Sequence, residues 1–262
     1  MTDTSNNLPI SHRGGELVEP NSVRHPVLRR MTEGLLEQVR QMAVQRARYR
    51  LGAYELREPD YRLICLWAND LSMAPQALLD ILVQGRFIRD DVEQVAFAVE
   101  DGAIISLVWD FDSLPRFPDL WVDGLSLQTL AFIWRKKLHG VSLVPKAPSL
   151  RRLCICPEKL ASENATDCHL DLSGVQNLTV LECYGFGISK LDLSPVPGLT
   201  ELGCSENRLT ELDLSPVPGL TELWCWGNQL TELDLSPVPG LTVLRCWGNQ
   251  FTELDLSPVP GR

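Results

Sequence analysis

The feature that most constrains this chain is a repeat of 21 residues in its C-terminal third. One full unit, residues 220–240, reads LTELWCWGNQLTELDLSPVPG. Self-similarity at a fixed period of this length is the signature of a solenoid, in which each unit buries its apolar face only by stacking on its neighbours. A leucine column and a cysteine column recur at this period: Leu191, Leu212, Leu233 and Leu254, and Cys183, Cys204, Cys225 and Cys246.

Each unit contains two short segments, LTELxC and LTELDL, in which apolar and polar residues alternate. Alternation at period two predicts a half-buried strand. Two such segments per unit predict two parallel sheets that face each other across a narrow core, with the leucines and cysteines inside. The PVPG segment lacks a backbone donor at both prolines, so it predicts an extended return arc rather than a helix.

This pattern resembles the leucine-rich-repeat family, whose consensus is LxxLxLxxNxL. The resemblance covers residues 170–262 and is strongest to the bacterial subclass with 21-residue units. It implies a right-handed solenoid of parallel β strands with mostly non-helical return arcs. The first unit departs from the consensus, because Phe186 stands where Asn is expected. In a later unit the matching positions are Leu220, Leu223, Cys225, Asn228 and Leu230. We interpret the Asn column as structural, because an amide at an inward turn satisfies backbone groups that no strand pairs.

The chain before the regular repeats divides into three parts. Residues 1–23 are polar and predict a disordered tail. Residues 24–102 predict a mainly helical capping region, so the solenoid has an α-helical N-terminal cap. Residues 103–169 carry fainter copies of the leucine spacing and predict degenerate repeats. Within these parts we expect helices at 26–51, 75–84 and 90–99, and strands at 62–67 and 103–109.

The titratable side chains of the repeats do not form a recognisable metal site. Cysteines stacked one per coil supply poor disulfide geometry, and zinc needs a tetrahedral cluster. Cys154, Cys156 and Cys168, with His169 adjacent, have a spacing that is not typical of zinc. We therefore predict structural thiols, no metal and no cofactor. Rows of acidic residues on the second segment predict a solvated face, with a calcium site or a basic partner as the alternative: Asp192, Asp213, Asp234 and Asp255, and Glu211, Glu232 and Glu253.

The outward positions of the first segment vary between units, whereas LDLSPVPGLT recurs unchanged. In leucine-rich-repeat proteins this strand lines the concave recognition surface, and the resemblance implies the same here. Trp, Tyr and Arg dominate binding hot spots. The alternative is an aromatic ladder that only stabilises neighbouring coils. We predict these ligand-binding residues: Glu182, Tyr184, Glu201, Glu222, Trp224, Trp226, Arg245 and Trp247.

Charge and composition restrict the partners. The net charge is −10, and residues 170–262 contribute −8 of it, which argues against nucleic acid. No apolar run is long enough for a membrane helix, and the first residues contain no apolar segment typical of a signal peptide. Eight cysteines without an export signal predict reduced thiols in the cytoplasm, although a route of export without a classical signal stays open.

No phosphate-binding loop, dinucleotide fingerprint or nucleophile elbow occurs, and the four histidines lie in unlike contexts. The leading hypothesis is a non-enzymatic protein-binding module that uses the concave aromatic face. One alternative is a bacterial effector or enzyme whose activity lies in residues 24–102, with the repeats recognising the target. Another is a self-associating structural protein, because residues 24–57 carry a net charge of +5 opposite the acidic repeats. Since the chain stops within a unit, we also expect self-association at the uncapped C-terminal end.

Overall fold

The computed structural model describes residues 34–38, 47–89, 92–136, 138–157 and 166–259. It separates two units, Met1–Ala47 and Arg48–Arg262. In the first unit residues 34–38 are helical, within the predicted helix at 26–51. The C-terminal end of that prediction is wrong, because Tyr49–Leu51 forms strand β1 and pairs antiparallel with β2, Tyr54–Leu56. Gly52 makes this turn possible with a φ of 59°. Residues 47 and 48 belong to neither a helix nor a strand. Residues 26–33 and 39–46 of that predicted helix, and the predicted tail at 1–23, lie outside the described residues.

Helix α2, Glu58–Asp70, replaces the strand predicted at 62–67. The apolar run is rich in residues that favour strands, but its buried side chains recur at helical spacing: Asp60, Leu63, Ile64, Trp67 and Ala68. Pro59 in the first turn and two acidic residues there suit a helix N-terminus. Helix α3, Pro75–Gln84, has the predicted bounds.

The third predicted helix, at 90–99, is wrong. Strands β3, Arg86–Arg89, and β4, Val92–Ala96, form an antiparallel hairpin, and β5, Ala98–Glu100, follows it. Val95 of β4 is buried with only 3% of its surface exposed. Strand pairing and this burial together decide the structure of the segment over its local propensity.

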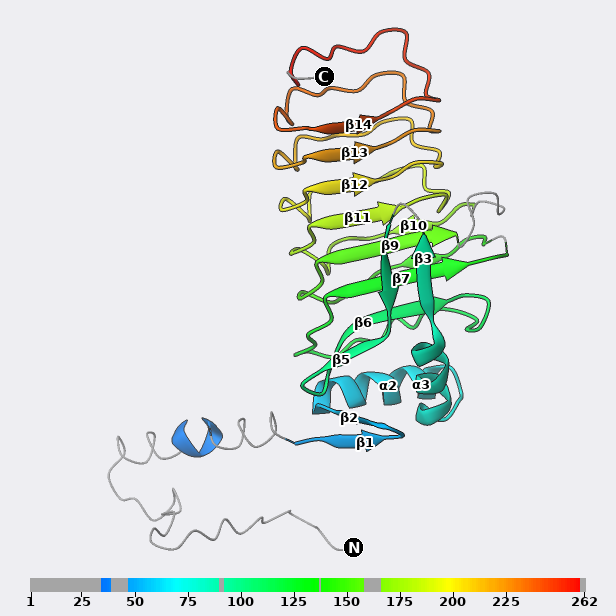
Figure 1. Cartoon of the computed structure of the whole chain (residues 1–262), viewed down its shortest axis with the longest axis vertical. Helices are drawn as coiled ribbons and strands as arrows, with labels where there is room; N and C mark the ends of the chain where they lie inside the picture. Colours follow the sequence, from blue (N-terminus) through cyan, green and yellow to red (C-terminus); the bar gives the residue numbers. More distant parts are fainter. Residues whose placement is uncertain (1–33, 39–46, 90–91, 137, 158–165, 260–262) are drawn as a thin grey trace, which may run out of the picture. The chain divides into compact units, whose positions relative to one another are not determined.

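One sheet of eight strands runs along the second unit, in the order β14-β13-β12-β11-β9-β7-β6-β5 (Figure 1). All neighbours are parallel except β5 and β6. The predicted strand at 103–109 is confirmed as β6, and the fainter repeats supply β7 and β9. The bounds are Ala103–Asp110 for β6, Thr129–Trp134 for β7, Arg152–Pro157 for β9, Val180–Cys183 for β11, Glu201–Gly203 for β12, Glu222–Trp224 for β13 and Val243–Arg245 for β14. The molecule is therefore a β-solenoid of parallel strands.

The predicted second sheet is wrong for the regular repeats. On that side only β8, Ser142–Leu143, and β10, His169–Leu170, pair as strands among the described residues. In later coils one backbone hydrogen bond per coil replaces the ladder, as from Gln229 N–H to the carbonyl of Leu209 (2.9 Å). The aspartate of each LDLS segment accepts the N–H of the serine two residues on, as Asp213 does from Ser215 (2.9 Å). This turn and the following proline bend the chain before a ladder can form.

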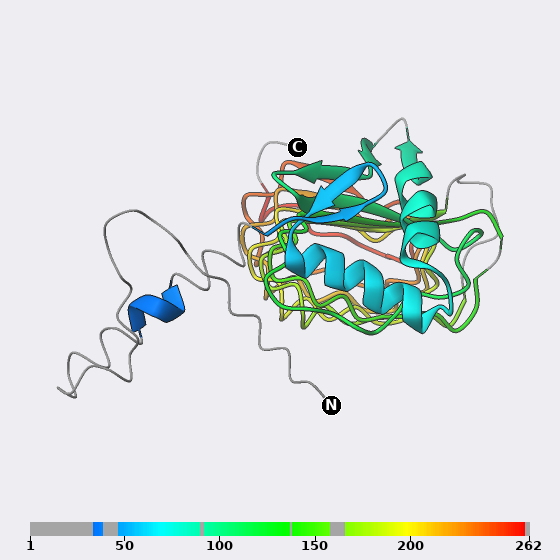
Figure 2. The ribbon, with the colours of Figure 1, turned by 90° about the horizontal axis from the view of Figure 1, so that it is seen from below.

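The coils enclose the leucine and cysteine columns, as predicted, and Figure 2 shows them stacked behind one another. Cys183, Cys204 and Cys225 are fully buried, and all eight cysteines are free thiols. Burial raises the pKa of the Cys204 thiol well above its ordinary value, so it is protonated at neutral pH. Helix α2 closes one end, where Trp67 packs edge-to-face on Trp109 of β6 at 5.5 Å between ring centroids.

The structural interpretation of the Asn column is confirmed. The Asn228 amide donates to the carbonyls of Cys204 (2.9 Å) and Cys225 (3.0 Å), while its oxygen accepts the N–H of Leu209 (3.1 Å). Phe186 takes the equivalent place in the first unit, where its fully buried ring lies 6.0 Å from that of Trp134. An apolar ring therefore replaces the hydrogen-bonding amide at that coil.

Candidate functional site

The outer face of the eight-stranded sheet is closed over its N-terminal strands. Side chains that alternate with the core residues form a second buried cluster there: Val108, Ala131, Ile133, Cys154, Cys156 and Tyr184, with Val95 of the β3–β4 hairpin. Strand β4 contacts β6 and β7, and Figure 1 shows the hairpin crossing this part of the sheet. Among the described residues, the outer face is therefore open to a partner over the C-terminal coils.

Two predicted binding residues, Glu182 and Tyr184, lie under this covered region rather than on an exposed surface. Glu182 is 3% exposed and Tyr184 is 4% exposed. The Cys154 thiol donates to Glu182 Oε2 (3.0 Å), and Arg152 Nη1 lies 3.4 Å from the same oxygen. Burial, and then the nearby Glu182 carboxylate, raise the pKa of Cys154 well above its ordinary value, so the thiol keeps the proton that it donates.

Tyr184 is buried because the next unit has glycine in the neighbouring outward row. Its hydroxyl and ring occupy the space that a Cβ on Gly203 would need. A larger residue at that position would displace the ring. The prediction that Glu182 and Tyr184 belong to an exposed patch is thus wrong, and both instead pack the outer face.

Trp226 and Trp247 form a parallel stack on successive coils. Their ring centroids are 4.5 Å apart and the rings are inclined by 9°. Trp247 is 64% exposed, whereas Trp226 is half-buried. Each tryptophan is followed by a glycine with positive φ, 70° at Gly227 and 69° at Gly248. The backbone therefore turns in the same way in both coils and holds the two rings in register.

Trp224 lies on the same side of the sheet but is more enclosed. Its ring is half-buried and packs against the second cluster, and its indole N–H is buried. Arg245 is the register partner of Trp224 on the next strand and is exposed. Four residues in register across β11 to β14 form this row: the buried Glu182, then Gly203, Trp224 and the exposed Arg245.

Glu201 and Glu222 form a neighbouring outward row. They are register partners on β12 and β13, and both are half-buried. Among the residues that the structure describes, no basic side chain lies within ion-pair distance of either carboxylate. Six of the eight predicted residues thus share the open part of the outer face, which we call the tryptophan face: Glu201, Glu222, Trp224, Trp226, Arg245 and Trp247.

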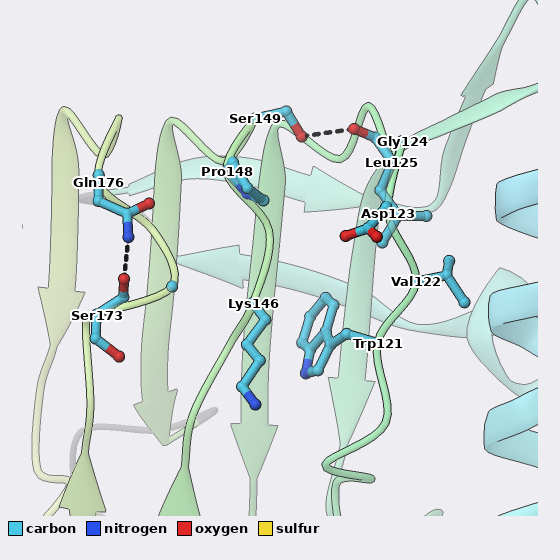
Figure 3. A pocket seen from close by; sticks show the side chains of 11 residues that line it. Trp121, Val122, Asp123, Gly124, Leu125, Lys146, Pro148, Ser149, Ser173 and Gln176 are labelled. Carbon is cyan, nitrogen blue, oxygen red and sulfur yellow. Dashed lines mark hydrogen bonds between the residues drawn. The ribbon is translucent and has the colours of Figure 1, made fainter.

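A pocket of about 750 Å³ lies away from this face, at the bends between the first coils (Figure 3). Trp121, Asp123 and Lys146 line it together with neighbouring loop residues. Two of its polar groups already serve the backbone. The Ser149 hydroxyl donates to the carbonyl of Leu127 (2.8 Å), and the Gln176 amide donates to the carbonyl of Ser173. Residue spacing gave no sign of this pocket, since its lining comes from three separate loops.

A groove of about 550 Å³ follows the acidic rows on the opposite side of the coils. Its floor is leucine, and its sides are the Glu and Asp rows. Hydrogen bonds from the backbone and side chain of Ser215 lower the pKa of Asp213, and the other aspartates of the row are held in the same way. These aspartates therefore build the turns of the coils.

No cluster of three or more His, Cys, Asp or Glu side chains suited to a metal ion occurs within the described ranges. The helices described here are all too short or too polar to cross a bilayer.

Comparison with known proteins gives partial structural matches. No protein-family model and no curated protein matches the chain. The functional domain of InlJ from Listeria monocytogenes, which includes a cysteine ladder, is 33% identical with a TM-score of 0.41, over 55% of this chain and 30% of that one. An internalin (inlF) from Listeria monocytogenes strain 4b F2365 is 17% identical with a TM-score of 0.33, over 50% of this chain and 51% of that one. This chain therefore spans less than two thirds of the length of either structure.

Proposed function

We propose that this chain is a non-enzymatic protein-binding module whose recognition surface is the tryptophan face. The observation that carries the proposal is the stack of Trp226 and Trp247, in which Trp247 keeps 64% of its surface exposed. Large aromatic side chains left open beside an arginine are the usual composition of a binding hot spot. A partner that covers them removes apolar surface from water and needs no further change in the sheet.

The competing explanation is that the two tryptophans only stabilise the coils that carry them. A stacked aromatic pair contributes about 0.5–1.5 kcal/mol beyond its buried area, so some stabilisation is expected in either case. Trp247 belongs to the last described coil, so its outer ring face is uncovered in either case. Binding and stability must therefore be measured separately on the same variants.

The test compares partner capture by the wild type with capture by the double variant Trp226→Ala plus Trp247→Ala. The matched control is Gln229→Ala plus Gln250→Ala, which changes exposed residues on the same two coils. Proteins captured from the source organism by the wild type and the control are expected to be lost with the tryptophan variant. With one such protein purified, loss of hot-spot residues is expected to weaken Kd at least tenfold. Equal capture by both variants, with both folded by circular dichroism, would refute the proposal.

The two alternatives drawn from the sequence stay predictions. An effector or enzyme activity in residues 24–102 would survive the tryptophan substitutions. Self-association through the basic segment and the acidic repeats would weaken at high salt, because exposed charges are screened within about 10 Å at 0.1 M ionic strength. Sedimentation of the full chain at low and high salt distinguishes this alternative from recognition by the tryptophan face.

A further inference from the structure

We infer that the partner enters the tryptophan face as a short extended segment carrying a lysine or arginine, which binds between Glu201 and Glu222 beside Trp224. This inference rests on the proposed function and adds the chemistry of the partner. It follows from the placement of the two carboxylates, from their neighbours on the sheet, and from the limited size of the open surface.

The glutamate pair has a charge arrangement that favours a cation. Glu201 and Glu222 are register partners on parallel strands, so their backbones lie about 4.8 Å apart. Both point outward, because they alternate with Leu202 and Leu223, which are fully buried in the core. Like charges directly opposite each other on a sheet destabilise it. A partner cation placed between the two carboxylates would convert that repulsion into two attractions.

The residues two positions further along each strand place aromatic side chains beside the glutamates. Gly203 follows Glu201 on the same side of β12 and presents no side chain, while the Tyr184 ring lies flush against it. Trp224 follows Glu222 on β13 and is half-buried against the same cluster as Tyr184. The two glutamates are therefore bordered along their strands by the aromatic side chains of Tyr184 and Trp224. Cations gain energy near aromatic faces, most of all near tryptophan.

The wider charge distribution agrees with this assignment. Residues 170–262 carry twelve acidic and four basic side chains, so a cationic segment is attracted to this region from a distance. Arg245 stands beyond Trp224 at the β14 end of the face, away from the β12 glutamate. The face is therefore acidic at one end and basic at the other, which fixes the direction of a segment that carries a basic residue.

The open area suits a segment rather than a folded domain. The β3–β4 hairpin and the second cluster close the outer face from β6 to Tyr184, leaving β12, β13 and β14. Three strands span about 10 Å across the sheet at the usual strand separation. Each partner in a typical stable interface buries about 800 Å², which is a much larger patch. An extended segment of about three residues, at about 3.3 Å per residue, matches this span.

The test is selection of random peptides displayed on phage against the full chain. Four forms are compared: the wild type, Glu201→Gln plus Glu222→Gln, Trp226→Ala plus Trp247→Ala, and the control Glu232→Gln plus Glu253→Gln. The control removes two exposed carboxylates outside the tryptophan face. Its net charge therefore changes by the same amount as that of the Glu201 and Glu222 variant. Peptides selected by the wild type are expected to be enriched in lysine or arginine at one position. A synthetic peptide of the selected sequence is expected to bind at least tenfold more weakly to the Glu201 and Glu222 variant and within twofold to the control.

Each result decides one question. Peptides without basic enrichment, or equal weakening by the two glutamate variants, would overturn the inference while leaving the proposed function in place. Peptides that bind the tryptophan variant as well as the wild type would place the binding surface elsewhere and overturn both. Failure to select any peptide would overturn a short-segment partner, and the capture experiment would then decide the proposed function alone.

Discussion

Asn207, Asn228 and Asn249 hold the turns of successive coils through the same three hydrogen bonds. Each amide donates to the carbonyl of the cysteine in its own coil and to that of the coil before, and each oxygen accepts one backbone N–H. At the residue scale, the sequence predicted this role correctly because the requirement is local. A turn that leaves inward backbone groups unpaired needs a short side chain with both a donor and an acceptor.

Replacing Asn228 by alanine is expected to destabilise the protein by roughly 3 kcal/mol, since buried backbone groups left without partners cost about 1–3 kcal/mol each. Urea unfolding followed by tryptophan fluorescence measures the change. Gln229→Ala, at an exposed neighbouring position, is expected to stay within about 0.5 kcal/mol of the wild type. A loss of stability no larger than that of this control would show that the amide bonds contribute little.

At the scale of the element, each regular coil consists of one short strand, one Asn turn and one Asp–Ser turn. The sequence predicted the first strand and the inward columns, because alternation acts within a few residues. The PVPG segment is non-helical as predicted, but the prediction that it is extended is wrong. Bonds such as Val217 N–H to the carbonyl of Leu214 (3.1 Å) and Leu220 N–H to the carbonyl of Val217 (3.0 Å) fold it into consecutive turns. The sequence also predicted a second strand, which does not form in the regular coils. There Asp213 accepts a hydrogen bond from the backbone N–H of Ser215, and the resulting turn prevents strand pairing. Both LTEL segments look alike by periodicity, and only the turn that follows distinguishes them.

The Asp–Ser turns predict how stability depends on pH. Serine hydrogen bonds lower the folded pKa of Asp192, Asp213, Asp234 and Asp255 below the ordinary value of 3.8. A depressed carboxyl pKa contributes stability above the unfolded value, and this contribution is lost as pH falls through the folded value. The temperature of the thermal midpoint is therefore expected to decrease as the pH is lowered below about 4.

The variant Asp213→Asn plus Asp234→Asn tests this mechanism, because asparagine keeps the acceptor oxygen but does not titrate. Its thermal midpoint is expected to fall less steeply than that of the wild type between pH 4 and pH 2. Identical pH profiles for the two proteins would assign the acid sensitivity to other groups, such as carboxylates on the outer face.

At the scale of the whole molecule, the parts that the sequence did not predict depend on contacts between distant segments. The hairpin at 86–96 covers the outer sheet face of β6 and β7. Local sequence patterns such as hydrophobic periodicity do not predict a contact between such distant segments. Contacts with other coils also bury Glu182, beside Cys154 and Arg152, and Tyr184, over Gly203, although the matching residues of the last described coil, Arg245 and Trp247, are exposed. The sequence therefore located the candidate face but not its N-terminal limit.

The last described coil leaves core positions uncovered. Leu244, Cys246, Phe251 and Leu254 are partly exposed and Leu256 is 45% exposed, while the matching positions one coil earlier are buried. We predict that the 262-residue chain associates through this surface, because water contact with so many apolar side chains is unfavourable.

Light scattering after size-exclusion chromatography measures this association. The variant Phe251→Glu plus Leu256→Lys is expected to shift the chain toward the monomer. The control Gln229→Glu plus Thr231→Lys places the same charges at exposed sites and is expected to leave association unchanged. A wild-type chain that is monomeric at every concentration would contradict the prediction.

The identical LDLSPVPGLT segments make the junctions between regular coils interchangeable. Duplication or deletion of one 21-residue module would leave the same junction on both sides. The coils of the new array would therefore stack without any further change of sequence. Such an event would widen or narrow the proposed recognition surface by one strand, while helix α2 and the β3–β4 hairpin stay unchanged. Specificity in this architecture can therefore change by copying whole modules as well as by point substitution.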